Sequence, residues 1–197
     1  MSTASQFQPI SVRDYLHGER TAKQKHEYVN GVVYAMAGGT VQHSRIASNA
    51  TGALFAQLRS HKCQVYNSDI KIRVRMSQGT RFYYPDLSVV CEPNADSDSF
   101  HDAPILIVEV VSESTRRTDE YEKREAYLSI YSLCEYVLVE QSSALAHVYR
   151  RIDSGFDHEV YSGIDAIIPL PEINCQLPLK ELYQNVEFVP AFADDEC

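Results

Sequence analysis

The sequence predicts a layered α/β fold, and three features of the chain support that assignment. Apolar runs rich in Val, Ile and Tyr alternate with segments of helical periodicity, which is typical of a sheet covered by helices. Two of these runs, residues 84–90 and 105–112, have the composition of buried strands. An Asn-Gly pair at residues 30 and 31 separates two further β-rich runs, which is the strongest short-range signal for a hairpin. We therefore expect an α/β fold that includes antiparallel hairpins.

The first part of the chain predicts two helices, one on each side of the hairpin. Ser11 is a suitable N-cap for a short helix that ends at Gly18. Thr40, which follows two glycines, can cap a longer helix that extends to about His61. Apolar residues recur in this second segment at helical spacing, at Ile46, Ala50, Ala53, Leu54 and Leu58. We expect this helix to be the main one that packs on the sheet.

The middle of the chain predicts strands with polar connections. Residues 70–75 alternate apolar and basic side chains, which is the pattern of a strand with one solvated, basic face. A turn at residues 77–80 is expected to lead into the strand that carries Asp86. Residues 92–104 contain Pro, Asn and several Asp, so we expect a loop here rather than a linker between domains.

The last part of the chain predicts a helix followed by further strands. The helix begins at about Thr118 and places Lys123 and Tyr127 on one face. Three β-rich segments follow it, at residues 135–140, 146–149 and 159–161. The two shorter segments are candidates for an antiparallel pair.

Length and charge restrict the architecture and the partners. A chain of 197 residues suits one well-packed domain, so we expect a single domain over residues 1–197, with about ten peripheral residues at each end. The net charge of −9 argues against non-specific binding of nucleic acid through a broadly basic surface. A local site for an anionic partner stays open, because many acids gather near the C-terminus and at residues 96–102.

Cysteine usage and hydropathy bear on the compartment. The five cysteines are widely spaced and form no CxxC motif or Cys/His cluster, so we expect neither a disulfide framework nor a zinc site. The N-terminus lacks the basic and apolar regions of a secretory signal, and no stretch approaches the roughly 20 apolar residues that span a bilayer. We therefore expect a cytoplasmic protein with no membrane partner.

The two buried strands each carry an acid, Asp86 in the first and Glu109 in the second. An unpaired carboxylate in such surroundings is costly or becomes neutral through a shift of its pKa. Two acids that share a divalent cation avoid this cost, and hard oxygen ligands suit Mg²⁺. The alternative is that each acid caps a strand end or pairs with Arg73 or Arg81. We favour a metal site with Asp86 and Glu109 as its ligands.

These acids and the residues that follow them resemble a known family. Pro85-Asp86, Glu109 with residues 110–112, Lys123 and Tyr127 resemble the PD-(D/E)XK nuclease superfamily, and specifically its Uma-type branch of restriction-endonuclease-like proteins. Three further segments resemble that branch in the same order, at residues 26–34, 38–44 and 135–139. The resemblance covers residues 10–150 and implies a restriction-endonuclease-like fold, in which helices flank a central mixed sheet.

The resemblance also implies roles for particular residues. Asp86 and Glu109 would bind Mg²⁺, with Mn²⁺ as a substitute, and a lysine would orient or deprotonate the attacking water. That lysine normally stands two residues after the second acid, where this chain has Val111. The Uma-type pattern offers Lys123 instead, whose long side chain can reach back toward the strand that carries Glu109. The alternative is that Lys123 belongs to a solvated charged face.

Five other residues are candidates for supporting roles. Glu27 matches a helper acid of related nucleases, or it is an exposed glutamate at a strand end. His43 matches a family histidine and is a candidate for substrate binding, or it is a structural hydrogen-bonding group in a helix. Ser112, Arg116 and Arg117 follow Glu109, where guanidinium groups would suit a substrate phosphate. An ordinary solvated loop is the alternative for these three.

We thus interpret the chain as a magnesium-dependent endonuclease that hydrolyses DNA phosphodiester bonds, with Asp86, Glu109, Lys123 and Glu27 as catalytic residues. One alternative is a catalytically inactive binding module that keeps the nuclease fold, which Val111 and the net charge of −9 favour. Another is a hydrolase of a smaller phosphoester. The sequence leaves open whether the chain forms a homodimer.

Overall fold

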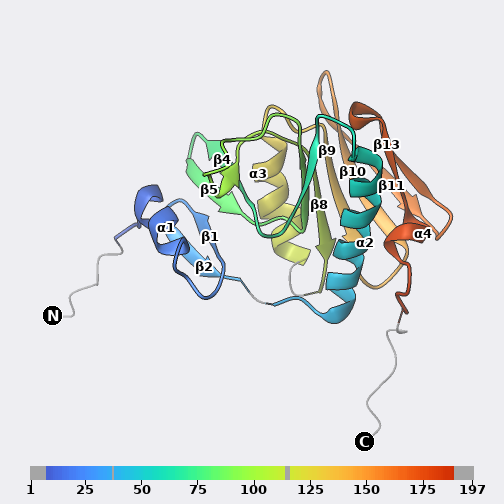
Figure 1. Cartoon of the computed structure of the whole chain (residues 1–197), viewed down its shortest axis with the longest axis horizontal. Helices are drawn as coiled ribbons and strands as arrows, with labels where there is room; N and C mark the ends of the chain where they lie inside the picture. Colours follow the sequence, from blue (N-terminus) through green and yellow to red (C-terminus); the bar gives the residue numbers. More distant parts are fainter. Residues whose placement is uncertain (1–7, 37, 114–115, 189–197) are drawn as a thin grey trace, which may run out of the picture.

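The computed structural model describes residues 8–36, 38–113 and 116–188, which form an α/β fold with two larger sheets and one small one (Figure 1). The first sheet has the strand order β2-β1-β5-β4-β7. Its strands are β1 (His26–Val29), β2 (Val32–Ala35), β4 (Lys71–Met76), β5 (Gly79–Tyr83) and β7 (Phe100–His101). The second sheet has the order β11-β10-β9-β8-β6-β3. Its strands are β3 (Gln64–Asn67), β6 (Leu87–Val90), β8 (Pro104–Val111), β9 (Glu135–Glu140), β10 (Leu145–Ile152) and β11 (Gly155–Ser162).

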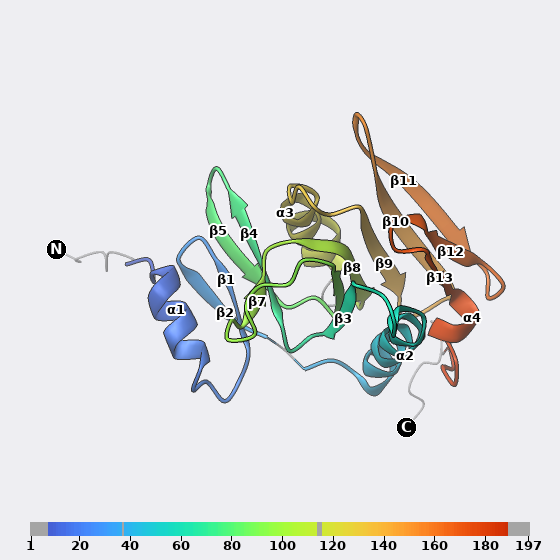
Figure 2. The same cartoon turned by 45° about the horizontal axis from the view of Figure 1, so that its top comes forward.

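The helices and the small sheet complete the fold. The helices are α1 (Val12–Glu19), α2 (Val41–Leu58), α3 (Arg124–Leu128), α4 (Leu179–Leu182), the π-helix η1 (Thr118–Lys123) and the 3₁₀-helix η2 (Pro171–Ile173). The small sheet pairs β12 (Ile167–Leu170) with β13 (Cys175–Pro178), and this hairpin and α4 lie beside α2 (Figure 2). No helix among the residues described is long and apolar enough to cross a membrane.

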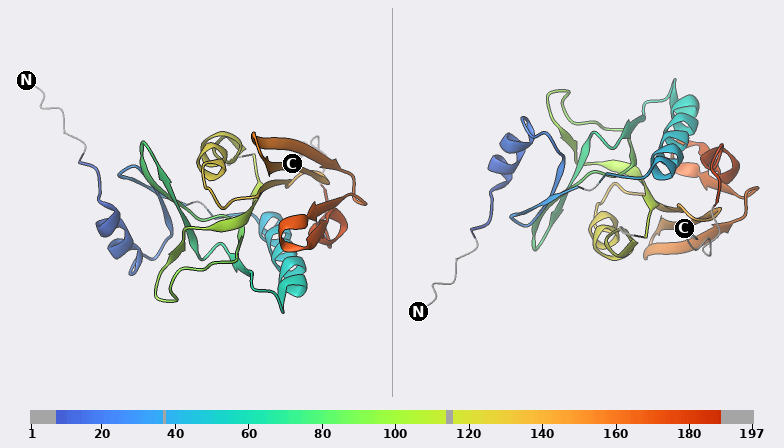
Figure 3. Two further views of the ribbon diagram at one scale, coloured as in Figure 1. Left: turned by 90° about the horizontal axis from the view of Figure 1, so that it is seen from above. Right: turned by 90° about the horizontal axis from the view of Figure 1, so that it is seen from below.

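The second sheet is mixed and carries helices on both faces. Strands β8 and β9 run parallel, so η1 and α3 form the crossover between them, whereas β6 runs antiparallel to β8. Alternate residues of β8 face opposite sides: Val108 and Val110 pack in the core beneath α2, and Ile107 and Val111 pack in the core beneath α3. Figure 3 shows α2 and α3 on opposite sides of the strands. The predicted mixed sheet flanked by helices is therefore confirmed.

Local signals explain several of these elements. Ser11 and Thr40 cap α1 and α2, and each hydroxyl accepts a hydrogen bond from the backbone three residues on. Asn30 and Gly31 adopt positive φ angles of 50° and 97° in the β1–β2 turn, as a tight hairpin requires. The Asn-Gly hairpin and both capped helices are thus confirmed.

Other expectations for this region were wrong. The turn at residues 77–80 leads into β5 of the first sheet, and only then does the chain cross to β6 beyond Asp86. Lys71 is not on a solvated face but is buried, and its ammonium donates to the Tyr84 hydroxyl at 3.0 Å. Cys63 and Cys91 form a disulfide, because Cys63 directly precedes β3, Cys91 directly follows β6, and the antiparallel pair Gln64–Val90 brings the two cysteines together.

Candidate active site

The site lies where the chain crosses from the first sheet to the second. Pro85 has no N–H to continue the ladder, and the pairing of β6 with β8 begins at Leu87. The carboxylate of Asp86 takes over one ladder position, because its Oδ2 accepts the Val110 N–H at 2.8 Å. In return, the Asp86 N–H donates to Glu109 Oε2 at 3.2 Å. The two predicted metal ligands are therefore held together at the carboxyl end of β8.

His43 joins this group from the first turn of α2. Its Nε2 lies 3.2 Å from Asp86 Oδ2, and both side chains are 16% exposed. The hydrogen bond to Asp86 raises the pKa of His43 above its usual value, although burial acts in the opposite direction. The helix that Thr40 caps thus delivers an imidazole to the carboxylate that ends β6.

Lys123 lies at the centre of a ring of acids. Its Nζ is 3.2 Å from Glu27 Oε1, 3.3 Å from Glu109 Oε1 and 3.3 Å from Asp119 Oδ1. The residue is only 7% exposed, so it does not belong to a solvated charged face. Glu27 comes from β1 of the first sheet, far from Glu109 in the sequence, and Asp119 comes from η1, which follows β8.

The charges of this cluster depend on one another. Burial raises the pKa of Glu109 well above its usual range, and Lys123 opposes this shift. Burial acts to lower the pKa of Lys123, but Glu109, Glu27 and Asp119 outweigh it and hold that pKa well above its ordinary value. A single buried ammonium therefore faces three carboxylates, with Asp86 as a fourth acid beside them.

Two tyrosines fix the elements that carry the cluster. The Tyr127 hydroxyl donates to Glu109 Oε1 at 3.3 Å, and the Tyr136 hydroxyl donates to the Asp119 carbonyl at 3.1 Å. This second contact ties β9 to η1, a wide helical turn of the kind that recurs at functional sites. The sequence predicted that Lys123 and Tyr127 share a face, and both indeed contact Glu109. It missed Asp119, which its spacing of four residues from Lys123 could have indicated.

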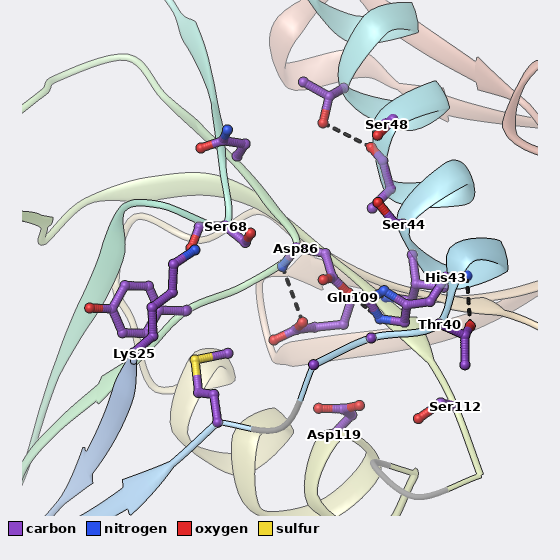
Figure 4. A pocket seen from close by; sticks show the side chains of 18 of the residues that line it. Lys25, Thr40, His43, Ser44, Ser48, Ser68, Asp86, Glu109, Ser112 and Asp119 are labelled. Carbon is purple, nitrogen blue, oxygen red and sulfur yellow. Dashed lines mark hydrogen bonds and ion pairs between the residues drawn. The ribbon is translucent and has the colours of Figure 1, made fainter. Parts of the chain in front are cut away.

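The cluster forms the floor of a solvent-open pocket with a volume of about 1040 Å³. Asp86, Glu109, Asp119 and Lys123 line its floor, and Ser112 also lines it. Figure 4 shows His43, Asp86 and Glu109 close together, with Thr40, the N-cap of α2, and Ser44 and Ser48 of α2 on one side and Lys25 and Ser68 on the other. A substrate in this pocket would therefore meet the acids directly.

The two arginines proposed for phosphate binding lie outside this pocket lining. Arg116 is held by Glu140 at 2.7 and 2.8 Å through two guanidinium nitrogens, and by Glu120 at 2.7 Å. These contacts anchor the start of η1 to the end of β9. Arg117 is exposed and does not line the pocket. Their role in substrate binding stays a prediction.

The oxygen donors of this site suit a hard divalent cation, although the side chains alone do not supply all the ligands that such an ion needs. Among the residues described, no group of three or more His, Cys, Asp and Glu is arranged to hold a metal ion. Asp86 and Glu109 offer carboxylate oxygens, and Val110 lines the pocket with its N–H directed at Asp86. In a strand the carbonyl of a residue points to the same side as its N–H, so the Val110 carbonyl is a third oxygen on that side. Two carboxylates and a carbonyl fit Mg²⁺, which keeps several waters.

Comparison with known proteins places this chain among relatives of similar length. It is 35% identical over 155 residues to the uncharacterized protein slr1290 of Synechocystis sp., which covers 78% of this chain and 80% of that protein. It is 27% identical over 146 residues to the uncharacterized protein sll1609 of the same organism, covering 73% and 81% of the two chains.

The fold also matches a solved structure. A crystal structure described as a putative nuclease belonging to DUF820 from Anabaena variabilis superposes with a TM-score of 0.70 over 89% of this chain and 98% of that one. The sequence identity is 19%, so this match concerns the fold. The family model Uma2, described as "Putative restriction endonuclease", matches residues 12–180. This chain therefore belongs to the Uma2 family.

Proposed function

We propose that this protein is a magnesium-dependent endonuclease that hydrolyses phosphodiester bonds of DNA in the cytoplasm. One observation carries the proposal: a single buried cation, Lys123, faces the carboxylates of Glu27, Glu109 and Asp119, and the last two of these line an open pocket together with Asp86. Buried carboxylates in excess of their cations are costly, and a divalent ion bound by two of them removes that cost. Membership of a family described as restriction endonucleases supports the same reading.

The residues of the floor have separate tasks in this proposal. Asp86, Glu109 and the Val110 carbonyl would hold Mg²⁺, which lowers the pKa of a bound water and stabilises charge on a phosphate. Because three carboxylates surround Lys123, it keeps its charge and donates a hydrogen bond to the attacking water rather than accepting its proton. Glu27 and Asp119 hold that ammonium in position when Glu109 engages the ion. His43 orients Asp86 through their contact at 3.2 Å.

The position of Lys123 also bears on whether the site is active. Val111, where related nucleases place the lysine, is 1% exposed and packs in the core beneath α3. The ammonium of Lys123 nevertheless lies within 3.3 Å of Glu109, next to the second acid. This geometry supports an enzyme with a relocated lysine over an inactive binding module.

Circular DNA substrates test the proposal directly. Purified protein with Mg²⁺ should open both supercoiled plasmid and single-stranded circular DNA, and efficient opening of either one supports the proposal. EDTA should stop the reaction. Asp86→Asn, which keeps the shape of the side chain, should lose this activity. Cleavage that persists in Asp86→Asn, or hydrolysis of mononucleotide esters without any cleavage of circular DNA, contradicts the proposal.

A further inference from the structure

The pocket continues from the acid cluster along one side of α2. The buried side of this helix packs on the sheet through Ile46, Ala50, Leu54 and Leu58. A second side is held by the C-terminal segment, because Arg45 and Asn49 donate to carbonyls of residues 182–185. The third side lines the pocket with small and hydroxyl-bearing residues, which include Ser44, Ser48, Thr51 and Gly52. We call this third side, from Thr40 to Phe55, the α2 track.

The segment that carries the α2 track is free of acids. Residues 28–68 contain no Asp or Glu, although the whole chain has 27 of them and a net charge of −9. The same segment carries basic groups toward the end of α2, at Arg59, His61 and Lys62. Acids are thus absent from this wall of the pocket, as a wall that receives an anionic chain requires.

An exposed aromatic ring stands at the far end of the track. Phe55 is 55% exposed, and it lines both the large pocket and a neighbouring cavity of about 280 Å³. Arg59, His61 and Gln64 line this second cavity as well. Since an α-helix rises about 1.5 Å per residue, Phe55 lies about 18 Å along α2 from His43. The route therefore runs from the acid cluster, past hydroxyl groups, to an aromatic ring and then to basic side chains.

We propose that the α2 track binds a single nucleic-acid strand, whose scissile phosphate lies at the acid cluster and one of whose unpaired bases stacks on Phe55. This inference rests on the proposed function and names its substrate as single-stranded. A flat aromatic ring can stack on a base only when that base is unpaired. Hydroxyl groups such as those of Ser44 and Ser48 can donate to phosphate or sugar oxygens without adding charge.

The charges of the pocket favour one strand over two. A duplex carries one phosphate charge per roughly 1.7 Å of its axis, and its binders contact many of these with Lys and Arg. Within the described part of the chain, the lining of the large pocket includes two lysines and no arginine. Lys123 is buried among acids, and Lys25 already donates to Ser68 and Asp69 at 2.8 and 2.7 Å. So sparse a set of cations suits a strand held by stacking and hydrogen bonds.

Binding without cleavage tests the stacking step. With Ca²⁺ in place of Mg²⁺, fluorescence anisotropy should show a labelled single strand of about eight nucleotides binding at least tenfold more tightly than a blunt duplex of that length. Phe55→Ala should weaken single-strand binding about tenfold, which is typical for the loss of one stacked base. Tyr131→Ala is the matched control, because that ring is 95% exposed but lies outside both cavities. Equal affinity of Phe55→Ala and the parent protein, or tighter binding of the duplex, overturns the proposal.

A pair of charge variants tests the path along the helix. Ser48 and Ala56 are both exposed on α2, but only Ser48 lines the large pocket. Ser48→Glu should weaken single-strand binding at least fivefold more than Ala56→Glu does. If both variants weaken binding equally, the effect is long-range charge and the α2 track is not the binding path.

The proposed function and the α2 track can fail separately. The parent protein should hydrolyse a single strand of about eight nucleotides with a higher kcat/KM than a dinucleotide, which is too short to span the track. Phe55→Ala should reduce that advantage. If Asp86→Asn abolishes cleavage but Phe55→Ala keeps the full advantage, the track is wrong and the nuclease stands. If the single strand binds through Phe55 and Ser48 but is never cleaved, the track stands and the nuclease is wrong.

Discussion

Glu109 and Glu135 stand in the neighbouring parallel strands β8 and β9, and both are almost fully buried, at 3% and 0% exposure. Both lie in apolar, strand-like sequence, so their local sequences look alike. Their surroundings differ, because Glu109 lies near the carboxyl end of β8 and Glu135 is the first residue of β9. The two acids therefore belong to separate charge clusters at opposite ends of the same pair of strands.

The cluster around Glu135 is closed and nearly balanced. Arg150 bonds Glu135 at 2.6 Å and Glu159 at 2.8 Å, and it also donates to the Pro169 carbonyl at 3.0 Å. Burial raises the pKa of Glu135 to about 7, although Arg150 acts against this shift. Its Oε2 is buried with no hydrogen-bond partner, as suits a carboxyl that takes up a proton. Arg150 and the proton on Glu135 therefore compensate the negative charge of this cluster.

The cluster around Glu109 is open and unbalanced. Four acids share one lysine and one histidine, and three of these acids, Asp86, Glu109 and Asp119, line the open pocket. A buried strand acid therefore indicates a metal site only when its cluster has more carboxylates than cations and is open to solvent.

Removing the negative charge of each glutamate in turn should have different effects on cleavage in the two clusters. Glu109→Gln should lower Mg²⁺-dependent cleavage roughly 10³-fold, because a lost metal ligand weakens a stabilisation of several kcal/mol. Glu135→Gln should cleave at nearly the parent rate. A nicking assay on circular DNA measures both, and thermal melts show whether each variant folds. Similar losses in the two variants, at equal melting temperatures, contradict the distinction.

Lys123 is the next target. Lys123→Ala should lower cleavage roughly 10²-fold, which is typical for the loss of one hydrogen-bond donor that is fixed at the reacting atoms. It should also lower stability by about 3 kcal/mol without Mg²⁺, because Glu27, Glu109 and Asp119 lose their buried cation. Adding Mg²⁺ should restore part of that stability by mass action. A variant that cleaves at the parent rate removes Lys123 from the mechanism.

A second substitution can sharpen the role of Lys123. Val111 shares a face of β8 with Glu109, so Val111→Lys in the Lys123→Ala background should restore part of the cleavage rate. Val111 is 1% exposed, so the double variant needs its own melting curve. A folded double variant without any gain in rate indicates that the ammonium acts from the η1 side only.

The smallest effect concerns pH and the closed cluster. Because the folded-state pKa of Glu135 is about 7, above the ordinary value of 4.5, the folded state holds a proton more tightly than the unfolded state. The resulting stability is complete below pH 4.5 and is lost as the pH rises through 7, by up to about 3 kcal/mol. Denaturant unfolding should show a flatter pH profile for Glu135→Gln in this window. An unchanged profile means that Arg150 keeps Glu135 ionised.

Much of the fold could be predicted from local signals. The caps Ser11 and Thr40, the Asn-Gly turn and the apolar spacing of α2 act within a few residues, so the sequence shows them directly. The pairing of Asp86 with Glu109 was also predicted, from the apolar runs that carry the two acids, whereas the inclusion of Lys123, Glu27 and His43 rested on a family resemblance. The structure shows the contacts among these residues, whereas their catalytic roles stay proposals.

The remainder depends on pairing that local signals do not contain. The split into two sheets follows from the crossing at Pro85, and the burial of Lys71 follows from its contact with Tyr84. The Cys63–Cys91 disulfide follows from the register of β3 and β6, which spacing in the chain does not indicate. Arg116 was a candidate for binding a substrate phosphate, but β9 supplies Glu140 to bind it. Contacts between distant segments decided each of these cases.

A crystal soaked in Mn²⁺ tests the central claim most directly, because the anomalous signal of this ion locates it without assumptions. We expect a peak about 2.1 Å from carboxylate oxygens of both Asp86 and Glu109, and no peak at Glu135. The Lys123 ammonium should then keep its contacts with Glu27 and Asp119. An empty acid cluster at saturating Mn²⁺, with Lys123 still bound to Glu109, would contradict the claim that this cluster is a metal site.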